Sequence, residues 1–314
     1  MNIRYVDPLS RGFARMKKAL FDPFDLQKWL IVGFTAFLAG LSNWSSGGRA
    51  GMNRGGKLDP ETVLYFPQRA WEWLLDHPIW AAIIVFVTFL LFALVLLISW
   101  LSARGKFMFL DNVVYNRSQV VAPWKEFRNE GNSFFLFSLL FGLVVFALII
   151  AYLTYCFISL QTIYEISRNI RALFWPVIVA GLGFVAILAA GGFISLLLRD
   201  FVVPIMYKDR ITTSNAIQKL FPLFRSQLLY FIVYGLFVLF LLLIILIGII
   251  IAGFATCCIG FLFLVIPYIN SVFLLPVSYT MRAFAVEFLE QFGPEYQIFP
   301  RPDTNSDIGQ PFTA

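Results

Sequence analysis

Charged side chains are scarce in this sequence. Only 13% of the 314 residues are Asp, Glu, Lys or Arg, and 60% are hydrophobic, whereas a soluble domain carries about 25% charged residues. A soluble core of this length could not bury so much apolar surface. In lipid, only helices or closed barrels satisfy their backbone groups, and the long, unalternating apolar runs favour helices. The composition therefore predicts an all-α membrane protein.

Cysteine and histidine are too few to build a chemical site. Cys156 and the adjacent pair Cys257 and Cys258 give neither a disulfide framework nor the spacing of metal ligands. A single histidine, His77, does not make a multi-histidine zinc site. We therefore expect no catalytic residues, no cofactor and no metal, and a protein that is not an enzyme.

Apolar segments long enough to cross a bilayer, which takes about 20 residues, recur along the chain. They predict a polytopic transmembrane helical bundle over residues 1–290 and a polar cytoplasmic tail over 291–314. The first span is the weakest, because Asp25 and Lys28 leave only Trp29 to Leu41 uninterrupted, and a re-entrant or tilted entry is open there. The six predicted spans are 25–43, 78–103, 133–160, 173–198, 227–252 and 258–285.

Lysine and arginine alternate between rich and poor connecting segments. The segments up to residue 28, around 104–128 and around 199–225 hold 16 of the 24, against six in the intervening loops. Cytoplasmic loops carry the excess of Lys and Arg, so both termini are predicted in the cytoplasm. The net charge of +6 then indicates anionic lipid headgroups as the partner and argues against nucleic acid.

Each basic segment also has the pattern of an amphipathic helix that leads into a span. In the first, Leu9, Phe13, Met16 and Leu20 share one helical face. A shift of 93 residues superposes the second segment on the third, so the sequence predicts three repeats, each with an interfacial helix and a pair of spans. These helices either only connect the spans or also bind anionic lipid or a cytoplasmic partner. The candidate lipid contacts are Lys17, Lys18, Lys219 and Arg225.

Charges near the middle of a span would mark a transport path or a proton relay, and the predicted spans have none there. The most distinctive polar spot is Arg199 and Asp200, followed by Pro204, at the end of the fourth span. A helix-end ion pair or an arginine that reaches the headgroups explains these residues. A gating or binding role is the alternative.

The run Arg199-Asp200-Phe201-Val202-Val203-Pro204 and the amphipathic segment after it resemble a group of uncharacterised bacterial six-span membrane proteins. More distantly, the chain is similar to the membrane domains joined to some glycerophosphodiester phosphodiesterases. The resemblance covers most of the chain, which holds no phosphodiesterase catalytic domain. It implies an inner-membrane location and identifies no catalytic residue.

Two functions fit these patterns. The three basic segments favour a non-enzymatic protein that organises lipid or assists a membrane partner complex, with a protein partner or a homo-oligomer as further options. The repeats, the glycines of the fourth span and the prolines of the last favour the alternative, a transporter or channel for apolar or amphiphilic molecules. The first is our prediction.

Overall fold

The computed structural model describes residues 3–44, 66–167, 170–256 and 266–300, which contain helices and no strand. The α-helices are α1 (Val6–Leu20), α2 (Leu26–Trp44), α4 (Phe66–Asp76), α5 (Pro78–Val114), α6 (Val121–Glu126), α7 (Arg128–Ser167), α8 (Phe174–Leu197), α9 (Val203–Asp209), α10 (Thr213–Ser226), α11 (Leu228–Ala255), α13 (Pro267–Phe273) and α14 (Leu275–Glu290). Short 3₁₀ turns, η2 (Ile170–Leu173) and η4 (Pro294–Tyr296), and a π-helical turn, η3 (Leu198–Val202), complete the regular structure.

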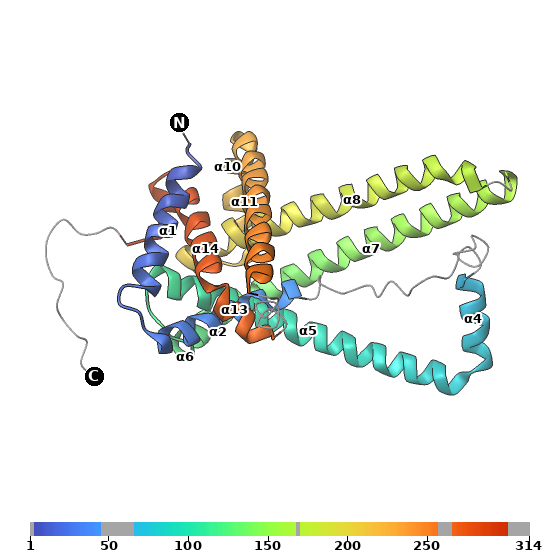
Figure 1. Cartoon of the computed structure of the whole chain (residues 1–314), viewed down its shortest axis with the longest axis horizontal. Coiled ribbons are helices and arrows are strands. Elements are labelled where there is room, and N and C mark those ends of the chain that lie inside the picture. Colours follow the sequence, from blue (N-terminus) through green and yellow to red (C-terminus); the bar gives the residue numbers. More distant parts are fainter. Residues whose placement is uncertain (1–2, 45–65, 168–169, 257–265, 301–314) are drawn as a thin grey trace, which may run out of the picture.

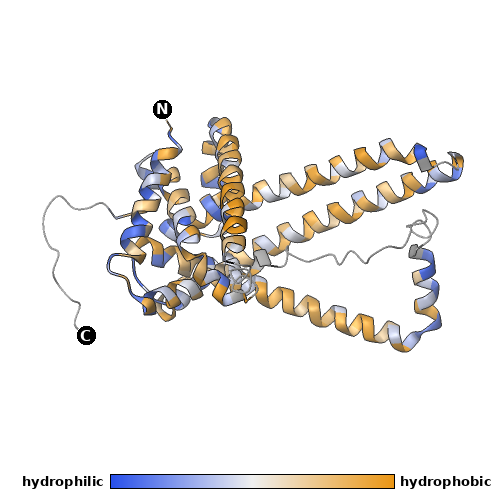
Figure 2. Cartoon of the chain, in the orientation of Figure 1, coloured by the Kyte–Doolittle hydropathy of each residue, from blue (hydrophilic) through white to orange (hydrophobic). Residues whose placement is uncertain are grey.

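Four stretches are long and apolar enough to cross a membrane: α5, α7, α11 and the run Arg171–Asp209, which contains α8. The protein itself covers almost none of their apolar surface, because at most 6% of the most apolar part of each is buried. Figure 2 shows, in orange, the hydrophobic residues that predominate along the four helices. α5, α7 and α8 extend to the same side of the molecule, whereas α11 runs across the direction of α7 and α8 (Figure 1). Apolar surface of this extent needs lipid around it.

Four predicted spans coincide with these helices. The first corresponds to α2, whose apolar part, Leu26–Leu41, is shorter. The sixth begins outside the described residues, and its described part is divided into α13 and α14 at Leu274. The adjacent Cys257 and Cys258 and the end of the predicted tail, 301–314, also lie outside the described residues. The all-helical class is confirmed with four long apolar helices, while six spans and three repeats stay predictions.

The buried side chains gather at one end of the long helices, in a region we call the base: residues 3–28, 102–134, 198–234 and 275–300. Aromatic rings fill its centre. Tyr234 of α11 lies 4.6 Å from Phe288 of α14, and Phe201 of η3 lies 5.0 Å from Phe231 of α11, measured between ring centroids. Large buried rings dominate the packing energy of a core, so this cluster holds α11, α14 and η3 together.

Small residues allow helices of the base to approach closely. A Cβ on Gly12 of α1 would lie 3.0 Å from the backbone nitrogen of Phe284 in α14. A Cβ on Gly105 of α5 would lie 2.6 Å from the backbone of α2. On α1 the buried residues are Pro8, Gly12, Met16, Ala19 and Leu20, while Phe13, predicted on that face, is 55% exposed.

The ends of α5 and α9 share an unusual conformation. Asn116, just beyond α5, and Arg210, just beyond α9, adopt left-handed backbone angles with φ of 53° and 56°. Such angles disfavour ordinary side chains. In each case a shorter helix follows, α6 or α10, and then a long apolar helix, α7 or α11.

Candidate functional site

The polar spot predicted from Arg199, Asp200 and Pro204 lies on the widened turn η3. Here the N–H of Val203 bonds to the carbonyl of Leu198, five residues back. Pro204 has no N–H to offer to the carbonyl of Arg199, five residues before it. Nη1 of Arg282 in α14 donates to that carbonyl instead, at 2.8 Å. The carbonyl that Pro204 leaves without a backbone donor therefore connects η3 to Arg282 of α14. Turns of the π type are frequent at functional sites.

The carboxylate of Asp200 is buried, with 4% of the residue exposed. Nε and Nη2 of Arg199 donate to its two oxygens at 2.7 and 3.1 Å. The hydroxyl of Tyr234, which is fully buried, donates to Oδ2 at 3.0 Å. Three donors thus satisfy a buried charge, and removal of any one of them would leave it less compensated.

Lys106 of α5 lies beside this ion pair. Its Nζ is 4.9 Å from the ring centroid of Phe134 in α7. None of the residues that the structure describes forms a hydrogen bond or an ion pair with Lys106. The charges of Arg199, Arg282 and Asp200 all act on it. We call Lys106, Arg199, Arg282 and Asp200 the basic cluster, because it combines three basic side chains with one carboxylate.

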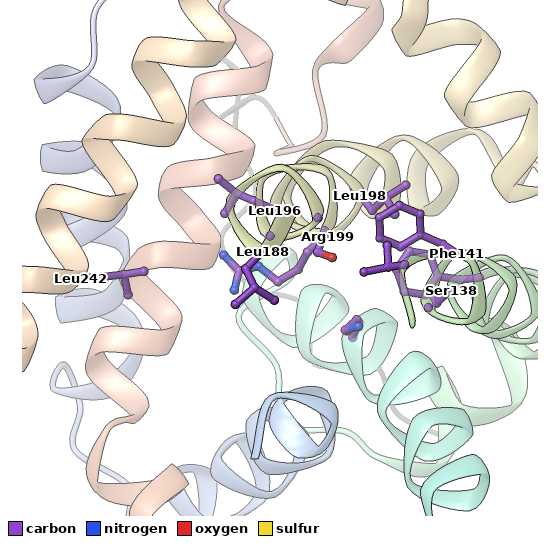
Figure 3. A pocket seen from close by; sticks show the side chains of 14 residues that line it. Ser138, Phe141, Leu188, Leu196, Leu198, Arg199 and Leu242 are labelled. Carbon is purple, nitrogen blue, oxygen red and sulfur yellow. The ribbon is translucent and has the colours of Figure 1, made fainter. Parts of the chain in front are cut away.

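Two cavities meet at the basic cluster. The first, of about 570 Å³, lies between α7, α8 and α11 and is lined by Lys106, Arg199 and mostly apolar side chains. Figure 3 shows Arg199 between Leu188 and Leu196 on one side and Ser138 and Phe141 on the other. We call this cavity the α8 groove. A hydrophobic groove with a cationic end is suited to an amphiphile that carries negative charge.

The second cavity, of about 410 Å³, lies between α5 and α7, and we call it the α5 groove. Its lining includes Phe92, Val95 and Leu96 on the α5 side. Four residues line both grooves: Lys106, Phe134, Ser138 and Gly142. The two grooves therefore share one cationic end.

The comparison with protein families gives a match over residues 3–297 to a family of unknown function, DUF7544. The chain belongs to DUF7544. The family is uncharacterised, as the resemblance from Arg199 to Pro204 predicted, and the match shows no link to the membrane domains of glycerophosphodiester phosphodiesterases. No curated protein and no solved structure matches the chain. The matched region of this DUF7544 chain contains the basic cluster and both grooves.

The predicted lipid contacts lie elsewhere on the base. Lys17 and Lys18 of α1 and Arg225 of α10 are exposed. Lys219 differs, because its Nζ pairs with Oδ2 of Asp209 at 2.6 Å. None of the four lines either groove.

Sequence reasoning on this DUF7544 chain missed two members of the basic cluster. Lys106 was counted with a cytoplasmic loop, because the second span was predicted to end at residue 103, whereas α5 continues to Val114. The apolar run Phe107 to Leu110 is the signal for this continuation. Arg282 falls near the end of the last predicted span, 258–285, and nothing in the sequence around it indicates a contact with Arg199, 83 residues away.

Proposed function

We propose that this protein is a non-enzymatic, multi-pass protein of the bacterial inner membrane that organises anionic lipid at the cytoplasmic leaflet. One observation carries the proposal. Of the 19 lysines and arginines in the described residues, 17 lie in the base, and Arg69 and Arg171 lie outside it. Cytoplasmic segments carry such an excess, and each cation near an anionic membrane surface contributes about 1 kcal/mol of attraction.

The proposal includes six spans with both termini in the cytoplasm. Support for the first and sixth spans comes from their contact, since the hydroxyl of Tyr268 in α13 donates to the carbonyl of Leu30 in α2 at 3.0 Å. Support for the repeats comes from the left-handed residues Asn116 and Arg210, which precede equivalent helix pairs. In this arrangement α1, α6 and α10 are the three interfacial amphipathic helices.

The test is the lipid retained by the full chain after polymer extraction from vesicles with equal phosphatidylglycerol and phosphatidylcholine. The variant combines Lys17→Glu, Lys18→Glu and Arg225→Glu and leaves Lys219 intact, because reversal there would place two carboxylates together at Asp209. We expect the ratio of phosphatidylglycerol to phosphatidylcholine to fall toward one, since about 1 kcal/mol of attraction is lost for each cation.

The matched control is Arg69→Glu in α4, outside the base. This variant should retain the same phosphatidylglycerol excess as the wild-type chain. A wild-type ratio of one, or an equal fall in the base variant and the Arg69 variant, would refute the proposed role of the base.

The alternative function, a transporter or channel for apolar or amphiphilic molecules, is favoured by the α8 groove itself. Its apolar wall includes Gly191 and Gly192 and connects the basic cluster with the apolar length of α7 and α8. The test is transfer of a fluorescent phosphatidylglycerol between the leaflets of vesicles that hold the protein. Transfer equal to that of protein-free vesicles would exclude this alternative for anionic lipid.

A further inference from the structure

We propose that the basic cluster binds the phosphate of one anionic diacyl lipid, with one acyl chain in the α8 groove and the other in the α5 groove. The inference rests on the proposed function, because it identifies the lipid and the place where the base would hold it. Three features carry it: the charge of the cluster, the shared end of the two grooves and their length.

The charge of the cluster calls for an anion. The charge of Arg199 is balanced by the carboxylate of Asp200, to which it donates two hydrogen bonds. One nitrogen of Arg282, Nη1, donates to the carbonyl of Arg199. Lys106, which is half-buried, has no such partner among the described residues. A cation held away from water without a partner is unfavourable. A lipid phosphate that accepts from the Lys106 ammonium would remove this penalty, and charge-assisted bonds of this kind are the stronger ones.

The two grooves share Lys106 and one face of α7, an arrangement that suits the single headgroup and two chains of a diacyl lipid. Phe134, Ser138 and Gly142 follow each other at intervals of four residues, so they share one face of α7. This face forms a ridge between the α8 groove and the α5 groove, since all three residues line both. Lys106 lies at the same junction and also lines both. A ligand with one headgroup and two chains fits this arrangement, whereas a single chain would fill one groove.

The length of the grooves matches one leaflet. The α5 groove extends along α7 from Phe134 to Phe146, which is about 18 Å at 1.5 Å per residue. The α8 groove extends along the Leu188–Leu198 stretch, which is about 15 Å on the same basis. Half of the hydrocarbon core is about 15 Å thick. The chains would therefore reach the bilayer midplane with the phosphate at the base.

Three glycines offer a matched set of variants. A Cβ at Gly142, Gly192 or Gly181 would have no neighbour within 4 Å, so a side chain can start at each of these positions without a clash at its first carbon. Gly142 lines both grooves, Gly192 lines only the α8 groove and Gly181 lines neither. Together with Lys106→Met, which removes the cation and keeps much of the side-chain length, these substitutions separate the contribution of the headgroup from that of each chain.

The experiment is native mass spectrometry of the full chain in detergent, titrated with phosphatidylglycerol. We expect one tightly held lipid per wild-type chain and at least tenfold weaker binding in Lys106→Met, which corresponds to about 1.4 kcal/mol. Gly142→Phe should weaken the binding of phosphatidylglycerol by a similar factor. Gly192→Phe should weaken the binding of the diacyl lipid more than the binding of the single-chain lyso form. The Gly181→Phe variant should bind phosphatidylglycerol as the wild type does.

Three results would overturn the inference: equal affinity of Lys106→Met and wild type, equal affinity for phosphatidylcholine, or displacement of the lipid by millimolar inorganic phosphate. The last would assign the cluster to free phosphate. If Lys106→Met binds normally while reversal of Lys17, Lys18 and Arg225 still lowers the phosphatidylglycerol ratio, the inference fails and the proposed function stands. If the wild-type chain shows no preference for phosphatidylglycerol in either experiment, both fail.

Discussion

The bond between Tyr234 and Asp200 gives a quantitative prediction for the base. In Tyr234→Phe the ring keeps its place among Phe201, Phe284 and Phe288, and only the hydroxyl that donates to Asp200 at 3.0 Å is lost. A hydrogen bond to a charged group contributes about 1.5–3 kcal/mol. Asp200 keeps both donors of Arg199, so we expect a loss of about 2 kcal/mol in the free energy of unfolding, in the middle of that range.

The assay is reversible unfolding of the full chain in mixed micelles, followed by tryptophan fluorescence. The control is Tyr268→Phe, which removes an exposed bond to a neutral carbonyl and should change the free energy by less than about 0.5 kcal/mol. In an Asp200→Asn background, Tyr234→Phe should have a smaller effect, because the two groups are coupled. Equal losses in Tyr234→Phe and Tyr268→Phe would refute the assignment of a stabilising charged bond.

Two further predictions concern the same region. Burial raises the pKa of Glu290, with a smaller contribution from Glu287; the folded state then binds the proton more tightly, so stability falls as pH rises above the ordinary value of 4.5. Glu290→Gln should remove this fall, measured as unfolding free energy against pH, and an unchanged profile would contradict it. Gly105→Ala should destabilise the chain by about 1–3 kcal/mol, because its Cβ meets the backbone of α2, whereas Gly40→Ala, with open space around it, should be neutral or stabilising in the same measurement.

The helical class and the long apolar helices could be predicted from sequence because lipid exposure makes entire segments apolar. The ends of these helices could not. α5 passes from lipid into the base near Ser102, and from there to Val114 nearly every residue is buried by protein. Several of its polar side chains are satisfied within the base, and Asp111, for example, pairs with Arg117 at 2.7 Å. From hydropathy alone, such charges predict that the span has ended and that a loop begins.

The candidate site was predicted in part for a similar reason. Arg199, Asp200 and Pro204 are adjacent in sequence and distinctive, so they could be recognised together. Their partners Lys106 and Arg282 come from other helices, and only the packing of α14 against η3 and of α5 against α9 and α14 brings them there. On α1, small residues such as Gly12 determine the buried face through close approach to α14, and hydrophobicity alone does not reveal them.

The most direct test of the central claim uses bacterial cells that express the protein. The protein is extracted from their membranes with a polymer, and the composition of the lipid that is extracted with it is measured. The account predicts that anionic phospholipid is enriched around the full chain relative to the bulk membrane. It also predicts that Lys106→Met releases one tightly held anionic lipid per chain, while an exposed control outside the base, Arg69→Met, keeps it. A bound-lipid composition equal to that of the bulk membrane would contradict the account.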